Sequence, residues 1–108
     1  MGQLGKHIIR LDHQPLISVI LPVYNSDLKF LERAIASVRR QIYENWEVCV
    51  ADDASTDLRI KPFLGKLSGE DRRIKVLFRD KNGHISACSN SALSLARGEW
   101  CALLDQDE

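Results

Sequence analysis

The sequence of 108 residues has little of several features that would place it in a specialised class of protein. Lys plus Arg and Asp plus Glu number 15 each, so the formal net charge is zero and no overall field favours nucleic acid or an anionic membrane. No apolar run reaches the roughly 18 residues of a membrane-spanning helix, and the first 15 residues lack the apolar core of a secretory signal. We therefore expect an ordinary globular domain with a cytosolic location.

Cysteine is also scarce. Cys49, Cys88 and Cys101 are odd in number, far apart and free of C-x-x-C spacing. No His or second Cys stands at ligand spacing beside them, so we expect buried, reduced thiols rather than metal ligands or a catalytic nucleophile. The phosphate-binding patterns G-x-G-x-x-G and G-x-x-x-x-G-K-[ST] do not occur, which argues against a dinucleotide enzyme or a P-loop nucleotidase.

Short apolar segments alternate with amphipathic ones along the chain. Residues 1–15 show no clear periodicity and are interpreted as a leader or linker, and residues 16–108 as one unit. Strands are predicted at 17–21, 46–51, 73–78 and 99–104, and helices from about 28 to 42, 58 to 67 and 85 to 96. This order predicts an α/β fold, a three-layer Rossmann-like sandwich with a mostly parallel sheet and right-handed crossovers.

Several residues mark the ends of these elements. Pro22 is expected to end the first strand, and one of residues 25–27 to cap the first helix. Pro62 falls in or near the first turn of the second helix, where proline is tolerated. Arg97 and Gly98 are expected to close the third helix as a basic last turn and a left-handed cap.

The most polar segments follow three of the predicted strands. PVYN follows the first, DDASTD the second and the acidic end of LLDQDE the fourth. In open parallel sheets, ligands bind beyond the carboxyl ends of the strands, near the point where the strand order reverses. Although loops after strands are often polar in any case, the sequence predicts a binding site at this edge.

Asp105 and Asp107 stand one residue apart after an apolar strand. In an extended segment they would share one face, and at roughly 5 Å with an effective dielectric near 20 their repulsion is about 3 kcal/mol. A bound Mg²⁺ or Mn²⁺ would remove this cost and could hold a diphosphate, with Glu108 as a further ligand. The alternative is a solvated acidic turn.

Other polar residues have chemical interpretations beside simpler ones. The ring of Tyr24 could stack on a nucleobase or lie half-packed under the loop. Asp52 and Asp53 are expected to point to opposite sides, so that one braces the following turn and the other faces the cleft, where it could accept an N–H of a base. Asn82 and Gly83 precede a helix whose first amides could meet an anion, although ordinary turn chemistry explains the same pair.

Four ordered segments, PVYN, SVRRQIYENWEVCVADDASTD, NGHISACSNSALSLARGEW and LLDQDE, resemble the nucleotide-binding half of glycosyltransferase family 2 over about residues 15–108. The resemblance implies a GT-A fold, and transfer of a sugar from a nucleotide-diphosphate donor to an acceptor hydroxyl with inversion. It also implies a Mn²⁺ or Mg²⁺ cofactor. The segment NGHISACSNSAL is most similar to bacterial enzymes that build cell-surface polysaccharides, rhamnosyl transferases among them.

The resemblance assigns roles by position. Pro22, Val23 and Tyr24 match the segment that lines the nucleoside pocket, and Asp53 matches the acid that contacts the base. Asn82, Gly83 and Ser86 match a stretch that closes over the donor. Asp105 and Asp107 match the DXD motif, in which the first aspartate lies near the ribose and the second holds the metal. Glu108 stands where family members often have another aspartate, which leaves its role open.

Family members continue past this motif into an acceptor-binding half that holds the catalytic base. No residue of this chain matches that base, so we expect a donor-binding and metal-binding half that is inactive alone. The expected partners are a nucleotide-diphosphate sugar and a saccharide or lipid-linked acceptor, without nucleic acid. The full-length protein would be cytoplasmic, with peripheral association at the inner face of the membrane as an option.

Two other functions are alternatives to this one. The first is a noncatalytic nucleotide or nucleotide-sugar binding module. The second is a phosphoacceptor signalling domain, because VCVADDAS superficially resembles the acidic start of receiver domains. In those domains the acid pair follows the first strand, whereas here it follows the second, so the sequence disfavours this function.

Overall fold

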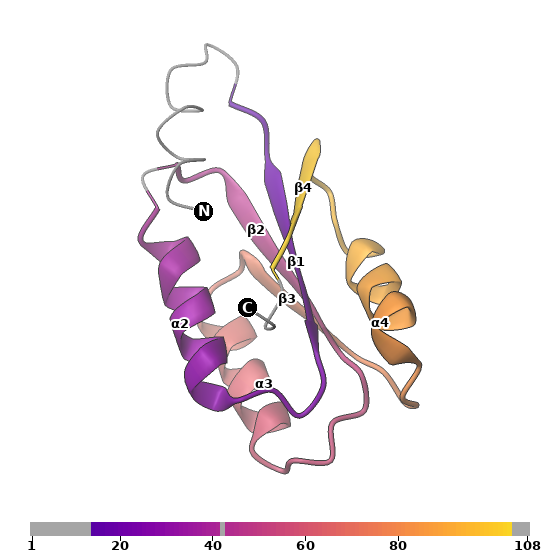
Figure 1. Ribbon diagram of the computed structural model, residues 1–108. Helices are drawn as coiled ribbons and strands as arrows, with labels where there is room; N and C mark the ends of the chain where they lie inside the picture. The colour runs from indigo at the N-terminus through magenta and orange to yellow at the C-terminus, as the bar shows by residue number, and fades with distance from the viewer. Residues whose placement is uncertain (1–13, 42, 105–108) are drawn as a thin grey trace.

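The computed structural model describes residues 14–41 and 43–104, apart from the side chains of residues 84–86. Within it, four strands form one sheet in the order β3-β2-β1-β4, and all paired strands are parallel. The elements in chain order are β1 (Ile17–Val23), α2 (Leu28–Arg39), β2 (Trp46–Asp52), α3 (Ile60–Glu70), β3 (Ile74–Phe78), α4 (His84–Leu93) and β4 (Trp100–Leu103) (Figure 1). The predicted α/β class with a parallel sheet is confirmed.

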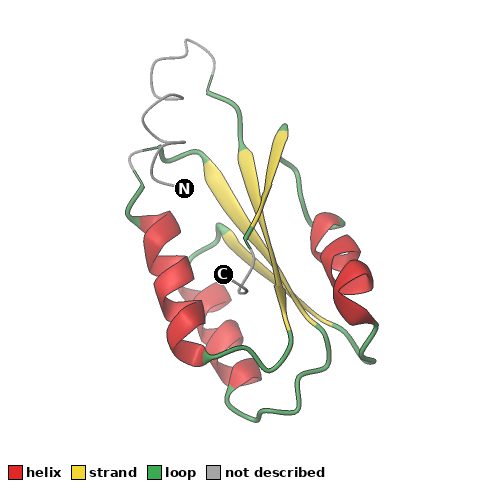
Figure 2. Ribbon diagram, in the orientation of Figure 1, coloured by secondary structure: helices red, strands yellow, loops and turns green. Residues whose placement is uncertain are grey.

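Helices cover both faces of the sheet. Helices α2 and α3 lie on one face and α4 on the other (Figure 2). Because successive side chains of a strand point to opposite faces, Val19 and Leu21 of β1 join the core with α2 and α3, whereas Ile20 joins a smaller cluster with Cys88 and Ala92 of α4. Burial on both faces explains the continuous apolar run of β1 and confirms the predicted three layers.

The strand order reverses beside β1. The chain passes from β1 outward to β2 and β3, then crosses back through α4 to place β4 on the other side of β1. The carboxyl ends of β1 and β4 therefore flank the position where open α/β sheets bind ligands.

Helix α2 begins where predicted, at Leu28, but ends at Arg39, about three residues earlier than predicted. Asp27 is its N-cap and accepts a hydrogen bond from the Lys29 amide at 2.9 Å. Leu28 is half-buried and Ile42 lies outside the described residues. The buried face consists of Leu31, Ala34, Ile35 and Val38, as the apolar periodicity predicts.

Helix α3 begins two residues later than expected. Asp57 accepts from the Arg59 amide at 3.0 Å and pairs with its guanidinium at 2.9 Å, so the intervening residues form a turn in which Leu58 is exposed. Pro62 lies in the first helical turn, which confirms its predicted place.

The prediction that Pro22 ends the first strand is wrong, because β1 continues to Val23. The Val23 carbonyl accepts a hydrogen bond from the Asp53 amide on the β2 side, and the Ile20 carbonyl accepts one from the Leu104 amide on the β4 side. The backbone of Pro22 faces the β4 side, as that of Ile20 does, because alternate residues of a strand face the same side. The β1·β4 pairing, however, ends at the pair Ile20 and Leu103. The missing N–H of Pro22 therefore removes no hydrogen bond between strands.

The predicted end of the third helix is also wrong. Helix α4 stops at Leu93, and the Ser94 amide donates to the Asn90 carbonyl at 3.0 Å. Gly98 does not have the positive φ of a left-handed cap. A side chain there would lie 2.6 Å from the Leu16 carbonyl oxygen, so this glycine permits close approach to β1 instead.

Two of the three cysteines match the prediction. Cys49 and Cys88 are buried and free, and burial raises the pKa of Cys49 to about 12, as expected for an inert thiol. Cys101 is free but exposed, so its predicted burial is wrong. It lies in β4, which pairs with β1 alone among the described strands and leaves Trp100 and Leu103 exposed as well.

Residues 1–13 of the predicted leader lie outside the described residues. The last two residues of that segment contact the domain, because the Gln14 carbonyl accepts from Asn45 at 2.7 Å and the Pro15 carbonyl accepts from the Tyr43 hydroxyl. In the part of the chain that the structure describes, no helix combines the length and apolar character needed to cross a membrane.

A buried carboxylate organises the amino ends of the strands. Glu47 of β2 is 4% exposed and accepts from the Ser18 hydroxyl at 2.6 Å, from the Arg97 amide at 2.6 Å and from Lys75 at 2.6 Å. Burial, the largest influence, acts to raise the pKa of Glu47, but these contacts together hold it below its usual value. The network ties the segment between α4 and β4 to the sheet.

Candidate functional site

The carboxyl ends of β1 and β2 lie level at one edge of the sheet, and β4 runs in the same direction beside β1 but ends next to Ile20, three residues before the end of β1. Val23 pairs with Asp52, and the Asp53 amide extends this pairing by donating to the Val23 carbonyl at 2.8 Å. On the other side of β1, the Leu104 amide donates to the Ile20 carbonyl at 2.8 Å. The polar segments that follow β1 and β2 therefore start side by side, whereas the acidic residues after Leu104 lie outside the described residues.

The end of β1 combines buried and exposed residues. Pro22 and Val23 are buried, and Val23 packs in the core under α2 and α3. Tyr24 is 45% exposed, so much of its ring is open to a ligand. Its predicted stacking on a base stays a prediction.

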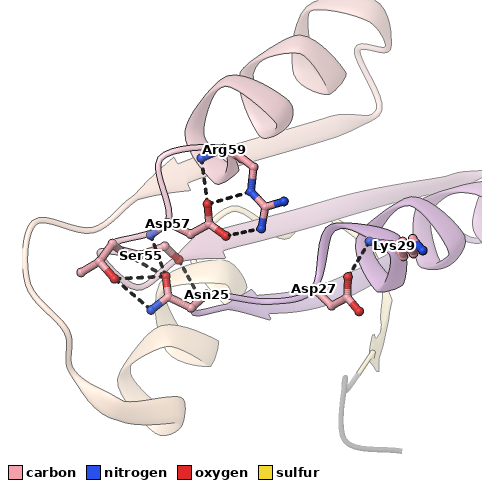
Figure 3. A network of polar contacts seen from close by, with 7 residues as sticks. Asn25, Asp27, Lys29, Ser55, Asp57 and Arg59 are labelled. Carbon is pink, nitrogen blue, oxygen red and sulfur yellow. Dashed lines mark hydrogen bonds and ion pairs between the residues drawn. The ribbon is translucent and has the colours of Figure 1, made fainter.

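A hydrogen-bonded clamp joins the loops after β1 and β2 (Figure 3). The side-chain oxygen of Asn25 accepts from the amides of Thr56 and Asp57, each at 2.9 Å. The backbone amide of Asn25 donates to the Ser55 hydroxyl at 2.8 Å. Asn25 has a φ of 47°, a left-handed conformation that asparagine tolerates better than most residues. The same residue therefore forms both the clamp and the backbone turn.

Asp52 braces its own loop. Its side-chain oxygen accepts from the Ser55 amide at 3.3 Å and from the Ser55 hydroxyl. Between them, Ala54 has a φ of 60°, an uncommon conformation for a residue with a side chain. The prediction that one aspartate of the pair holds the following turn is confirmed.

Asp53 points the other way, towards α4. It is 2% exposed, and one oxygen accepts from Arg79 at 2.7 Å. The Gly83 amide donates to both carboxylate oxygens, at 3.0 and 3.1 Å. The anion was predicted to meet the first amides of the helix, whereas here the amide of Gly83, just before α4, meets a carboxylate of the protein itself.

The remaining candidate residues differ in how far the structure describes them. Asn82 is exposed in the loop before α4, next to Gly83. Ser86 lies in the first turn of α4, but its side chain is not described. Asp105 and Asp107 lie outside the described residues.

Sequence reasoning missed two residues that hold this edge together. Arg79 directly follows β3 and has no role in the sequence analysis, although a cation next to a predicted acidic cleft is a signal for a carboxylate partner. Asn25 was considered only as a helix cap. Its alternative use follows from the preference of asparagine for left-handed turns, but its partners near Thr56 could not be read from spacing.

Within residues 14–41 and 43–104, no three side chains of His, Cys, Asp or Glu gather as a metal site. The carboxylates of Asp52 and Asp53 are already engaged by Ser55, Arg79 and Gly83.

A hollow of about 480 Å³ lies between α2 and α3, away from the carboxyl ends of the strands. None of the candidate residues lines it. It is bounded by apolar and charged side chains of both helices, among them Ile35, Arg39, Phe63 and Glu70.

The model of the family described as glycosyl transferase family 2 matches residues 18–108. The chain belongs to this family. Two curated relatives illustrate the match: protein y4gI of Sinorhizobium fredii, 50% identical over 107 residues, and the O-antigen biosynthesis protein RfbC of Myxococcus xanthus, 32% identical over 101 residues. The alignments cover 99% and 94% of this chain but 12% and 8% of the relatives, so the chain spans a small part of their length.

Solved structures of glycosyltransferases share the fold. TarS residues 1–349 of S. aureus in complex with UDP matches with a TM-score of 0.71 and 31% identity, over 84% of this chain and 27% of that one. The mannosyltransferase PcManGT of Pyrobaculum calidifontis, in complex with GDP-Man and Mn²⁺, matches with a TM-score of 0.70 and 22% identity, over 91% and 31%. These matches confirm the expected GT-A class for this family 2 chain.

Proposed function

We propose that this chain is the donor-binding half of an inverting glycosyltransferase, which transfers a sugar from a nucleotide-diphosphate donor to an acceptor hydroxyl in polysaccharide synthesis. One observation carries the proposal: β1, β2 and β4 are parallel and direct their carboxyl ends to one edge, where the strand order reverses and Asp52 and Asp53 are buried at the end of β2. The naming of RfbC for O-antigen biosynthesis supports the polysaccharide product.

In the proposed site, Asp53 accepts an N–H of the base and Tyr24 offers its exposed ring for stacking. Pro22 and Val23 form the wall behind the nucleoside, and Asn82, Gly83 and Ser86 close over the donor. The acceptor is a saccharide or a lipid-linked saccharide, and the full-length protein works in the cytoplasm, associated with the inner face of the membrane.

Asp107 is proposed to hold Mn²⁺ or Mg²⁺, with Asp105 near the ribose. The donor set fits, because carboxylate oxygens are hard ligands and these ions keep several positions for phosphate oxygens and water. When bound, the ion stabilises negative charge on the departing diphosphate. The Mn²⁺ in the PcManGT complex supports a divalent ion.

The test is calorimetric titration of UDP, TDP and GDP with and without MnCl₂, on the 108-residue chain and on Asp107→Ala. We expect Mn²⁺ to strengthen binding of at least one nucleotide, and Asp107→Ala to abolish that gain. Glu70→Ala, which removes an exposed carboxylate at the end of α3, is the matched control and should keep the gain. Ion-independent binding by both wild type and Asp107→Ala would remove the metal assignment.

A noncatalytic binding module is the second candidate, because no residue of this chain is matched to a catalytic base. Sugar transfer by the isolated chain, measured with a labelled donor, would contradict both this candidate and the proposed need for a base elsewhere. We expect binding without transfer.

A further inference from the structure

Arg79 and Gly83 divide the acceptor positions of Asp53 unequally. The Oδ1 atom accepts from Arg79 Nε at 2.7 Å and from the Gly83 amide at 3.0 Å. Among the described contacts, which do not include the side chains of residues 84–86, the Oδ2 atom accepts the second branch of the Gly83 amide alone, at 3.1 Å. The two oxygens are therefore not equivalent towards an incoming ligand.

Arg79 is itself held in place from two layers. Its amide donates to the Asp52 carbonyl at 2.8 Å, which fixes its backbone beside β2. Its Nη1 donates to the Ala87 carbonyl at 3.3 Å and to the Ser91 hydroxyl, both on α4. The Arg79 side chain is 23% exposed and that of Asp53 is 3% exposed, so the contact between them is sheltered from water.

A carboxylate offers about four lone-pair positions, two on each oxygen. Arg79 and Gly83 fill those of Oδ1, and Gly83 takes one of Oδ2, which leaves a single position on Oδ2. Asp53 is 2% exposed, so the protein covers nearly all of this residue. Asp53 is thus prepared to accept one N–H, not two.

The bases differ in what they offer to such an acceptor. Uracil and thymine present one ring N–H between two carbonyls. Guanine presents a ring N–H next to an amino group, and this pair of donors matches both oxygens of a carboxylate. Cytosine and adenine place an unprotonated ring nitrogen beside the amino group, and its lone pair would face the negative charge.

We propose that Arg79 is a specificity-determining residue: by occupying Oδ1 of Asp53, it restricts this position to a base with a single N–H, the uracil or thymine of a pyrimidine nucleoside diphosphate. The inference rests on the proposed function, in which Asp53 meets the base. Guanine would leave one donor without a partner, which lowers affinity by roughly 10- to 100-fold.

The test measures binding of UDP, TDP and GDP, each with MnCl₂, by the 108-residue chain and by Arg79→Met. This substitution keeps an unbranched side chain but removes every side-chain hydrogen-bond donor. The wild type should prefer UDP or TDP to GDP by at least about tenfold, and Arg79→Met should lose most of this preference. Arg72→Met, which changes an exposed arginine before β3, should retain it.

Circular dichroism checks the fold of each variant. If Arg79→Met does not fold, Ser91→Ala decides, because it removes only the hydroxyl partner of Arg79 and should narrow the preference. Equal affinity of the wild type for UDP and GDP would overturn the inference and leave the proposed function intact. The inference would also be overturned if a folded Arg79→Met, or Ser91→Ala in its place, kept the preference for UDP or TDP over GDP, because Arg79 would then have a purely structural role. If none of the nucleotides bound, the proposed function would fail, and the inference with it.

Discussion

At the scale of single residues, buried carboxylates divide the work between the two ends of the sheet. Asp53 lies at the carboxyl edge, where the site is proposed, and Glu47 lies near the amino ends of the strands. Both are almost completely buried, and both accept from a basic side chain and a backbone amide. Since a buried charge is tolerated only when it is paired, each must depend on its basic partner.

Glu47→Gln should destabilise the domain by about 2 kcal/mol or more at neutral pH, because it removes the charge that pairs with Lys75. The folded pKa of Glu47 lies below its ordinary value of 4.5. Its stabilisation is therefore complete above that pH and is lost as the pH falls through the folded pKa. Urea denaturation of wild type and variant should show a gap that narrows below pH 4.5.

Glu44→Gln is the matched control, since Glu44 is exposed three positions earlier in the chain. It should change the free energy of unfolding by less than about 0.5 kcal/mol at every pH. A gap for Glu47→Gln that did not depend on pH would show that the ionised carboxylate is not the stabilising group.

At the scale of elements, the chain between α4 and β4 is held by close backbone approach. The Glu99 amide donates to the Leu16 carbonyl at 2.9 Å, and the Gly98 amide donates to the Ser18 hydroxyl at 2.8 Å. This contact places β4 beside β1, on the side of the sheet where the strand order reverses. The position of the site therefore depends on a segment far from it.

Gly98→Ala should destabilise the domain by about 1–3 kcal/mol, because the new Cβ would lie 2.6 Å from the Leu16 carbonyl oxygen and 2.8 Å from the Ser18 amide nitrogen. Urea denaturation measures the change. Gly65→Ala within α3 is the control, since a Cβ there has nothing within 4 Å. That substitution should stabilise by about 0.5–1 kcal/mol, and the same effect at both positions would disprove the close-approach argument.

At the scale of the whole molecule, β3 and β4 are the two outer strands of the described sheet, and β4 carries the more exposed apolar side chains. In the described structure β4 pairs on one side only, and Trp100 and Leu103 are 61% and 62% exposed. An apolar strand with unpaired backbone groups is a template for pairing with another chain. This edge is the feature of the domain that most favours association.

The 108-residue chain should therefore self-associate as its concentration rises, and Leu103→Lys should shift it towards the monomer, as sedimentation velocity would measure. Leu58→Lys is the matched control, because Leu58 is 89% exposed but lies in the turn before α3. The edge would not be the contact if Leu58→Lys had the same effect as Leu103→Lys, or if wild type stayed monomeric.

The sequence by itself determined the elements, the parallel sheet and the family. Periodicity and capping are local, so the buried face of α2 and its cap at Asp27 could be read directly. The opposite directions of Asp52 and Asp53 followed from strand geometry, and the structure confirms them.

Only the tertiary structure decided what these residues touch. Arg79 reaches Asp53 across 26 positions and Asn25 reaches Thr56 across 31, and such contacts leave no periodic trace in a sequence. The same holds for Pro22, whose place inside β1 depends on where β4 stops, and for Cys101, whose exposure depends on β4 being at the edge. Spacing along the chain predicts local geometry, whereas pairing, burial and hydrogen-bond partners depend on which segments pack together.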